Sequence, residues 1–189
     1  MYAKVENNVI VKANSSLASF NRAAPSWSAE QLAANGIYEI VYDNSNLKDY
    51  RFYINGAESF TFANDTVTAS YTAAVGKTLD DVNATDEDGV ELDPVVVISG
   101  VKSIEKNQIK AQAASLLQST DWYVVRNAES STAIPANVST YRAAVRTKSN
   151  EMETAIDGAA SAEALEALFT YTTGADDVVS RPLGEWPKL

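Results

Sequence analysis

Apolar and polar residues alternate over short stretches at the start of the chain, a pattern typical of strands. Segments 2–6 and 9–13 alternate in this way and flank Asn7-Asn8. Because asparagine tolerates a positive φ, this pair suits a two-residue hairpin turn. Residues 37–42 read as a further strand, followed by a turn over 43–46.

A short helix is expected between these strands. Ser28 is a good N-cap, and Gln31 stands three residues later, as in a capping box. Gly36 follows as a C-terminal stop, because glycine accepts the left-handed conformation that ends many helices. The pattern therefore predicts one helix of about two turns.

Aromatic residues mark a second hairpin. Residues 50–54 alternate, Asn55-Gly56 is the pair typical of a type I′ turn, and Phe60 and Phe62 would lie on the return strand. Asn64-Asp65 then predicts another turn into a strand over 66–73, with Val67 and Tyr71 at alternating positions.

The periodicity becomes helical from about Ser103. Ile109, Ala113, Leu116 and Leu117 share the i, i+4, i+7, i+8 spacing of one helix face. Thr120-Asp121 interrupts this helix, the apolar run 122–125 follows, and 126–133 read as a polar loop.

A helix of about twenty residues is predicted after Pro135, which suits a helix start. It runs over 136–157 to Gly158, and its apolar stripe consists of Val138, Tyr141, Val145, Met152 and Ile156. Ser161 caps a last helix that should end near Gly174, and Trp186 anchors an extended tail.

Together these elements predict an α+β fold in three parts. Residues 1–77 form a small β-rich N-terminal domain, 78–100 an acidic connector with a short extended segment, and 101–189 a helical region of about three helices. The β-branched run 95–98 is too short for a helix and reads as a strand or an extended docking segment. The connector holds seven acids and no base: Asp80, Asp81, Asp86, Glu87, Asp88, Glu91 and Asp93. Such a segment buries little and is expected to be solvated.

The amino-acid composition excludes several classes of enzyme and metal site. The 189 residues include no cysteine and no histidine, which excludes disulfides, thiolate chemistry, serine–histidine hydrolases and histidine-ligated zinc or haem. The net charge of −10 argues against binding to nucleic acid. No apolar run approaches the length of a membrane helix, and the N-terminus has no pattern of a secretory leader.

Three motifs invite a chemical interpretation, and a structural one fits each better. Gly76-Lys77-Thr78 resembles the end of a phosphate-binding loop, but Tyr71 stands where the first glycine is needed. The acids before Gly89 do not match an EF-hand loop, because Ala84 would be the first ligand. Asp121 has no carboxylate nearer in sequence than Glu129, so a glycan hydrolase is only a remote alternative.

One stretch resembles a known family. Gln108 to Leu117 form a helix, followed by Thr120-Asp121-Trp122, then Arg126, Glu129, Ile134-Pro135 and Tyr141-Arg142-Ala143-Ala144-Val145-Arg146. This arrangement is similar to that of small tail-fibre assembly and tail-associated proteins of tailed bacteriophages. Residues 108–146 carry the likeness, and 1–40 resemble the family loosely. The family implies binding to a trimeric fibre without catalysis.

The sequence thus predicts a non-enzymatic structural component of a phage tail, in the fibre or baseplate, with no cofactor and no metal. It would be made in the host cytoplasm and reside in the virion. Partners would be fibre or baseplate proteins, or further copies around a symmetry axis; a transient assembly chaperone is the alternative. Because the helical stripes are narrow, another subunit is expected to complete them. The predicted core or contact residues are Ile109, Leu116, Leu117, Trp122, Tyr141, Val145 and Trp186.

Overall fold

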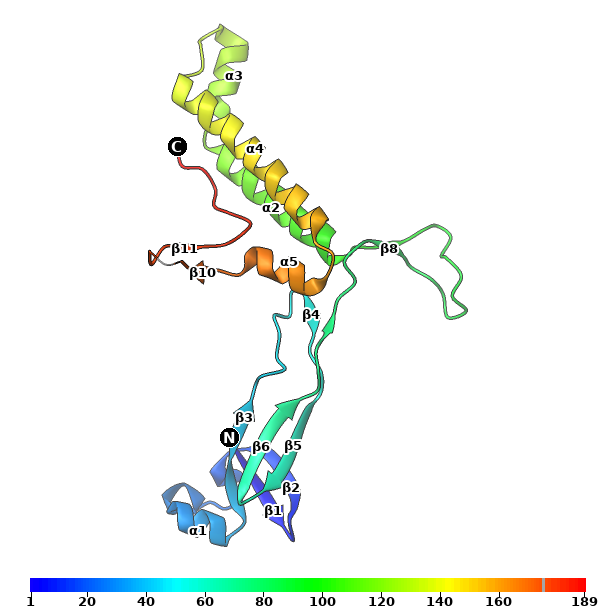
Figure 1. Ribbon diagram of the computed structural model, residues 1–189, viewed down its shortest axis with the longest axis vertical. Helices are drawn as coiled ribbons and strands as arrows, with labels where there is room; N and C mark the ends of the chain where they lie inside the picture. Colours follow the sequence, from blue (N-terminus) through cyan, green and yellow to red (C-terminus); the bar gives the residue numbers. More distant parts are fainter. Residues whose placement is uncertain (175) are drawn as a thin grey trace. The chain divides into compact units, whose positions relative to one another are not determined.

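The computed structural model describes residues 1–174 and 176–189, and the chain divides into two compact units. The first unit is Met1–Val75 and the second is Gly76–Leu189 (Figure 1). The first is rich in strands and the second in helices, so the predicted α+β class is confirmed. The acidic segment belongs to the second unit.

A five-stranded sheet in the order β2-β1-β3-β6-β5 forms the first unit. Its β1–β2, β1–β3 and β5–β6 pairs are antiparallel, whereas β3 and β6 run parallel. The strand bounds are β1 Tyr2–Glu6, β2 Val9–Ser15, β3 Ile37–Asp43, β5 Glu58–Ala63 and β6 Thr66–Tyr71. Between β2 and β3 lie the 3-10 turns η1 (Leu17–Ser19) and η2 (Ala24–Ser26) and the helix α1 (Ala29–Ala34).

Three of the local signals in this unit, two Asn-containing turns and one helix with its cap and stop, act as predicted. Asn7 and Asn8 have φ of 50° and 62° in the β1–β2 turn, and Asn64-Asp65 forms the equivalent turn between β5 and β6. Ser28 and Gln31 form a reciprocal capping box at α1. Gly36 has φ of 67°, and a Cβ there would lie 2.3 Å from the carbonyl oxygen of Val5, so only glycine fits.

The sheet curls around a small apolar core. Its buried residues are Ala3, Val5, Ile40, Val67 and Ala69, with Ile10, Ala13, Tyr38, Phe60 and Phe62 packed against them. The rings of Tyr38 and Phe62 lie 4.8 Å apart. Asn14 on edge strand β2 donates a 2.9 Å hydrogen bond to Glu58 on the opposite edge strand β5, and its amide oxygen accepts one from Tyr42. The curl thus brings the two edges together.

The predicted hairpin at Asn55-Gly56 is wrong. Strand β4 is only Tyr53–Ile54, and it pairs with β7 (Val75–Gly76), not with the segment that follows it. The Asn55 side chain bonds instead to both backbone groups of Lys48, at 2.9 Å each. The strand carrying Phe60 and Phe62 pairs with β6, as the Asn64-Asp65 turn predicts, and both partly buried rings pack against the sheet core.

Four helices dominate the second unit: α2 (Val101–Gln118), α3 (Asp121–Ser130), α4 (Ala136–Gly158) and α5 (Ala162–Phe169). Helices α2 and α4 lie side by side and antiparallel (Figure 1), as the pairs Lys106–Asp157 and Lys110–Glu153 require. Pro135 precedes α4, and Ser161 caps α5 by accepting from the Ala164 amide at 3.1 Å. Helix α5 ends at Phe169, before the predicted stop near Gly174.

Helix α3 corrects the sequence interpretation of 126–133 as a loop. The helix continues to Ser130 and ends at Ser131 in the left-handed conformation, φ 56°. The sequence did not predict this helix, because no residue of α3 is buried and its apolar residues form no stripe facing a core.

Residues 82–98 form a long hairpin, called the finger below. Its base is the antiparallel pair β8 (Val82–Asn83) and β9 (Val97–Ile98), extended by a bridge between Thr85 and Glu91. A second small hairpin, β10 (Thr172–Thr173) with β11 (Val179–Ser180), precedes the tail.

Candidate contact surfaces

The seam between α2 and α4 contains most of the predicted contact residues. Ile109, Tyr141 and Val145 are buried, at 2 %, 8 % and 0 % exposed. Leu116 and Leu117 are half-buried and pack against the cluster of Ala113, Tyr141 and Val145. These five residues are therefore core of the second unit.

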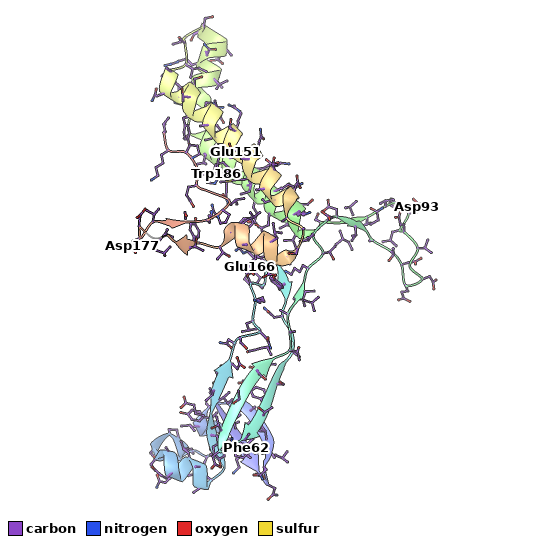
Figure 2. The ribbon with its side chains drawn as sticks, in the orientation of Figure 1. Phe62, Asp93, Glu151, Glu166, Asp177 and Trp186 are labelled. Carbon is purple, nitrogen blue, oxygen red and sulfur yellow. The ribbon has the colours of Figure 1, made fainter. Side chains whose placement is uncertain are left out.

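The C-terminal tail covers this seam. Trp186 packs on the same cluster and donates from its indole Nε1 to Gln112 Oε1 at 2.9 Å (Figure 2). The Leu183 amide donates to the Leu168 carbonyl at 3.0 Å, and the Leu183 side chain is 2 % exposed. The expectation that another subunit must complete the helical seam is thus wrong around Tyr141, because the chain's own tail does so.

A buried arginine joins the ends of three helices. Arg142 of α4 is 7 % exposed, and its Nη1 donates to the Leu117 carbonyl at 2.9 Å and to Thr120 Oγ1 at 2.6 Å. The same nitrogen pairs with Asp121 at 2.9 Å. Arg142, from the Tyr141-Arg142 motif, therefore binds both residues of the Thr120-Asp121 motif, and these bonds fix the start of α3.

The outer end of this helical hairpin presents an exposed apolar and aromatic surface. Trp122, Val124 and Val125 are 52 %, 40 % and 52 % exposed. The Arg126 guanidinium lies 4.6 Å from the Trp122 ring centroid and 5.3 Å from that of Tyr123. We call residues 122–126 the α3 surface. Of the residues expected at a contact, Trp122 alone is exposed to this degree.

The finger is a second exposed apolar segment. Val82, Val90, Leu92, Val95, Val96, Val97 and Ile98 are between 36 % and 61 % exposed. The run 95–98 reads from the sequence as a strand or an extended docking segment, whereas the valines of α3 were not predicted as contact residues. The available signal was the run of β-branched residues at 95–98 beside the acidic stretch.

The base of the finger is fixed electrostatically to α2. The Asp81 carboxylate accepts from the Gly100 amide at 2.8 Å, and this bond, with one from Ser103 and the charge of Lys106, lowers the pKa of Asp81. Lys102 pairs with Asp80 at 3.2 Å. A hydrogen bond to Asp157, together with nearby carboxylates, raises the pKa of Lys106. Thus both acids below the finger already have partners within the chain.

The residues considered for chemistry have structural roles. Asp121 is paired with Arg142, and Gly76 lies in strand β7. Across residues 1–174 and 176–189, no group of three or more acidic side chains is arranged to hold a metal ion. The helices in these ranges also include none with the length and apolar character of a membrane span.

Comparisons with family models, with curated proteins and with solved structures found no match for this chain.

Proposed function

We propose that this protein is a structural component of the tail of a tailed bacteriophage, a fibre or baseplate accessory subunit that acts by protein–protein contact. The observation that carries the proposal is the α3 surface, where Trp122 and Val125 are both 52 % exposed. The segment that resembles phage tail-associated proteins, residues 108–146, includes this surface.

The composition of the α3 surface supports a contact role. Tryptophan, tyrosine and arginine are the residue types that most often dominate binding energy at interfaces. Trp122 and Val125 or Arg126 follow the i, i+3, i+4 spacing, so they share one helix face. Burying an exposed tryptophan and valine together contributes about 2–4 kcal/mol of transfer free energy.

The mode of attachment supports the same role. A ten-residue helix with no buried residue would be marginal by itself. Arg142 holds the start of α3 through Thr120 and Asp121, so the surface is pre-positioned, which lowers the entropic cost of binding. In this proposal the fibre, the baseplate or a neighbouring copy covers the α3 surface in the virion.

Mass spectrometry of purified virions and of the infected-cell lysate tests the proposal. We expect the chain in mature particles at a fixed stoichiometry. Detection in the lysate but not in particles would replace the structural role with that of a transient assembly chaperone. Absence of the chain from both particles and fibre-assembly intermediates would refute the proposal.

Paired variants then test the α3 surface. Trp122→Ala with Val125→Ser should reduce incorporation of the chain into particles about tenfold. Val11→Ser provides the matched control, because Val11 is an exposed valine, 53 %, in the other unit. Equal incorporation of both variants would exclude α3 as the contact.

A further inference from the structure

The finger lacks what a two-stranded ribbon needs for stability in water. An isolated pair of strands is marginal unless another surface covers one of its faces. All seven large aliphatic side chains of the finger are at least 36 % exposed, so the described part of the chain leaves both faces open. Figure 2 shows Asp93 on the part of the finger away from the helices of its unit.

One face of the ribbon is a continuous apolar strip. Val82 pairs with Ile98, and residues directly opposite one another point to the same face. Val96 lies two residues before Ile98 and therefore faces the same side. Its carbonyl accepts from the Ala84 amide at 2.7 Å, which continues the pairing. Val82, Val96 and Ile98 are 44 %, 49 % and 55 % exposed, and we call them the finger strip.

The charge of the finger restricts what can cover this strip. Between residues 82 and 98 there are five carboxylates and no lysine or arginine. Asp86 shapes the turn by accepting from the amides of Asp88 and Val90, and Glu91 accepts from Asn83. The ion pairs formed by the described residues involve none of these five carboxylates.

The negative charge of the finger favours some binding partners over others. Two fingers meeting symmetrically would bring ten carboxylates together, and like charges placed in contact cost several kcal/mol. Nucleic acid and an anionic bilayer are repelled for the same reason. A protein surface with lysine and arginine around an apolar strip matches both the charge and the exposed aliphatics.

We propose that the finger docks, through its strip of Val82, Val96 and Ile98, on a basic surface of a different protein chain. The inference rests on the proposed function, in that this chain is another subunit of the tail. Burial of the strip supplies affinity, and the surrounding carboxylates supply orientation and a faster association rate. The site is distinct in sequence from the α3 surface.

Two finger variants of the full chain separate these contributions. Val82→Ser, Val96→Ser and Ile98→Ser together remove the strip. Glu87→Gln, Asp88→Asn and Asp93→Asn remove charge but retain Asp86 and Glu91, which bond within the finger. A control removes three exposed carboxylates elsewhere, by Glu6→Gln, Glu39→Gln and Glu151→Gln.

The binding probe is tail particles assembled without the chain, to which the purified full chain is added. We expect the strip variant to bind about tenfold more weakly. The charge variant should bind several-fold more weakly at low salt and show a flatter dependence on ionic strength, whereas the control should match the unmodified protein. A carbodiimide, which couples carboxylates to adjacent amines, should link Glu87, Asp88 or Asp93 to lysines of one other subunit.

The outcomes distinguish this inference from the proposed function. If the unmodified chain fails to bind the particles and is absent from virions, the proposed function fails, and the inference fails with it. If the chain binds, but both finger variants bind equally well and no finger cross-link forms, the inference is overturned while the tail role stands. Cross-links between fingers of two copies would also overturn it.

Discussion

Replacement of Arg142 by methionine offers a sharp test of how the second unit is held together. Methionine preserves most of the apolar stem of arginine and removes the guanidinium. Two hydrogen bonds from a charged donor are lost, to the Leu117 carbonyl and to Thr120 Oγ1. Such bonds contribute about 1.5 kcal/mol each at the lower end of their range.

The rest of the loss in unfolding free energy depends on the groups that the Arg142 guanidinium leaves without a bond. The Leu117 carbonyl keeps bonds from the Thr120 amide and hydroxyl, at 3.0 and 2.8 Å, so it is not left unsatisfied. The Asp121 side chain is 56 % exposed, so its lost ion pair adds less than about 1 kcal/mol. The variant should therefore lose about 3 kcal/mol of unfolding free energy, which lowers the melting temperature of the second unit by roughly 10 °C.

Calorimetry combined with amide hydrogen exchange measures this effect and locates it. Exchange should accelerate across α3 and the end of α2, while β1 to β6 of the first unit remain protected. Arg146→Met is the matched control, because Arg146 is exposed one turn further along α4, and it should cost less than about 0.5 kcal/mol. A midpoint for Arg142→Met equal to that of Arg146→Met would refute the reasoning.

Three further predictions follow from the packing. Trp186→Ala should destabilise the second unit by about 2 kcal/mol, because it uncovers the α2–α4 seam and removes the bond to Gln112; fluorescence-detected urea unfolding will measure this, and no change would show that the tail is dispensable. Gly36→Ala should destabilise the first unit by well over about 1 kcal/mol, because its Cβ would collide with the backbone of Val5. Gly89→Ala, where φ is 80° and the space is open, should cost only about 1 kcal/mol. Equal shifts of the melting temperature for the two variants would contradict this reasoning. Asp81→Asn should lower the melting temperature at neutral pH. Because folding lowers the pKa of Asp81, its carboxylate stabilises the fold above the ordinary pKa near 3.9, and this stabilisation disappears as the pH falls through the folded pKa. A difference in melting temperature from the unmodified protein that persists at pH 2 would exclude the charge of Asp81 as the cause.

Much of the local structure could be predicted because its signals act within a few residues. Asn7-Asn8 and Asn64-Asp65 form their turns since both residues of each pair tolerate a positive φ. Ser28 and Ser161 cap helices because a hydroxyl reaches an amide three residues on. The stripe of α4 was legible because the same face is buried along its whole length, as Val138, Val145, Met152 and Ile156 show.

The contact surfaces could be predicted only in part. Trp122 was identified as a residue for core or contact, but only the structure shows that Trp122 is exposed whereas Tyr141 is buried in the cluster on which Trp186 of the tail packs. The run 95–98 reads as a strand or an extended docking segment, because the sequence does not reveal which face of the finger stays uncovered.

The sequence by itself determined the α+β class, the turns at Asn7-Asn8 and Asn64-Asp65, two helix caps and the stripe of α4, because each signal comes from residues close together in the chain. Tertiary structure alone decided that 50–54 does not pair with the strand of Phe60 and Phe62, that the tail seals the seam, and that Arg142 meets Thr120 and Asp121. The tail and Arg142 contacts join residues 21 or more positions apart, and at Asn55-Gly56 the tertiary arrangement competes with an equally good local turn. The chain adopts the arrangement that buries more apolar surface and leaves fewer polar groups unpaired. Both quantities depend on segments distant in the sequence, so a local pattern does not reveal them.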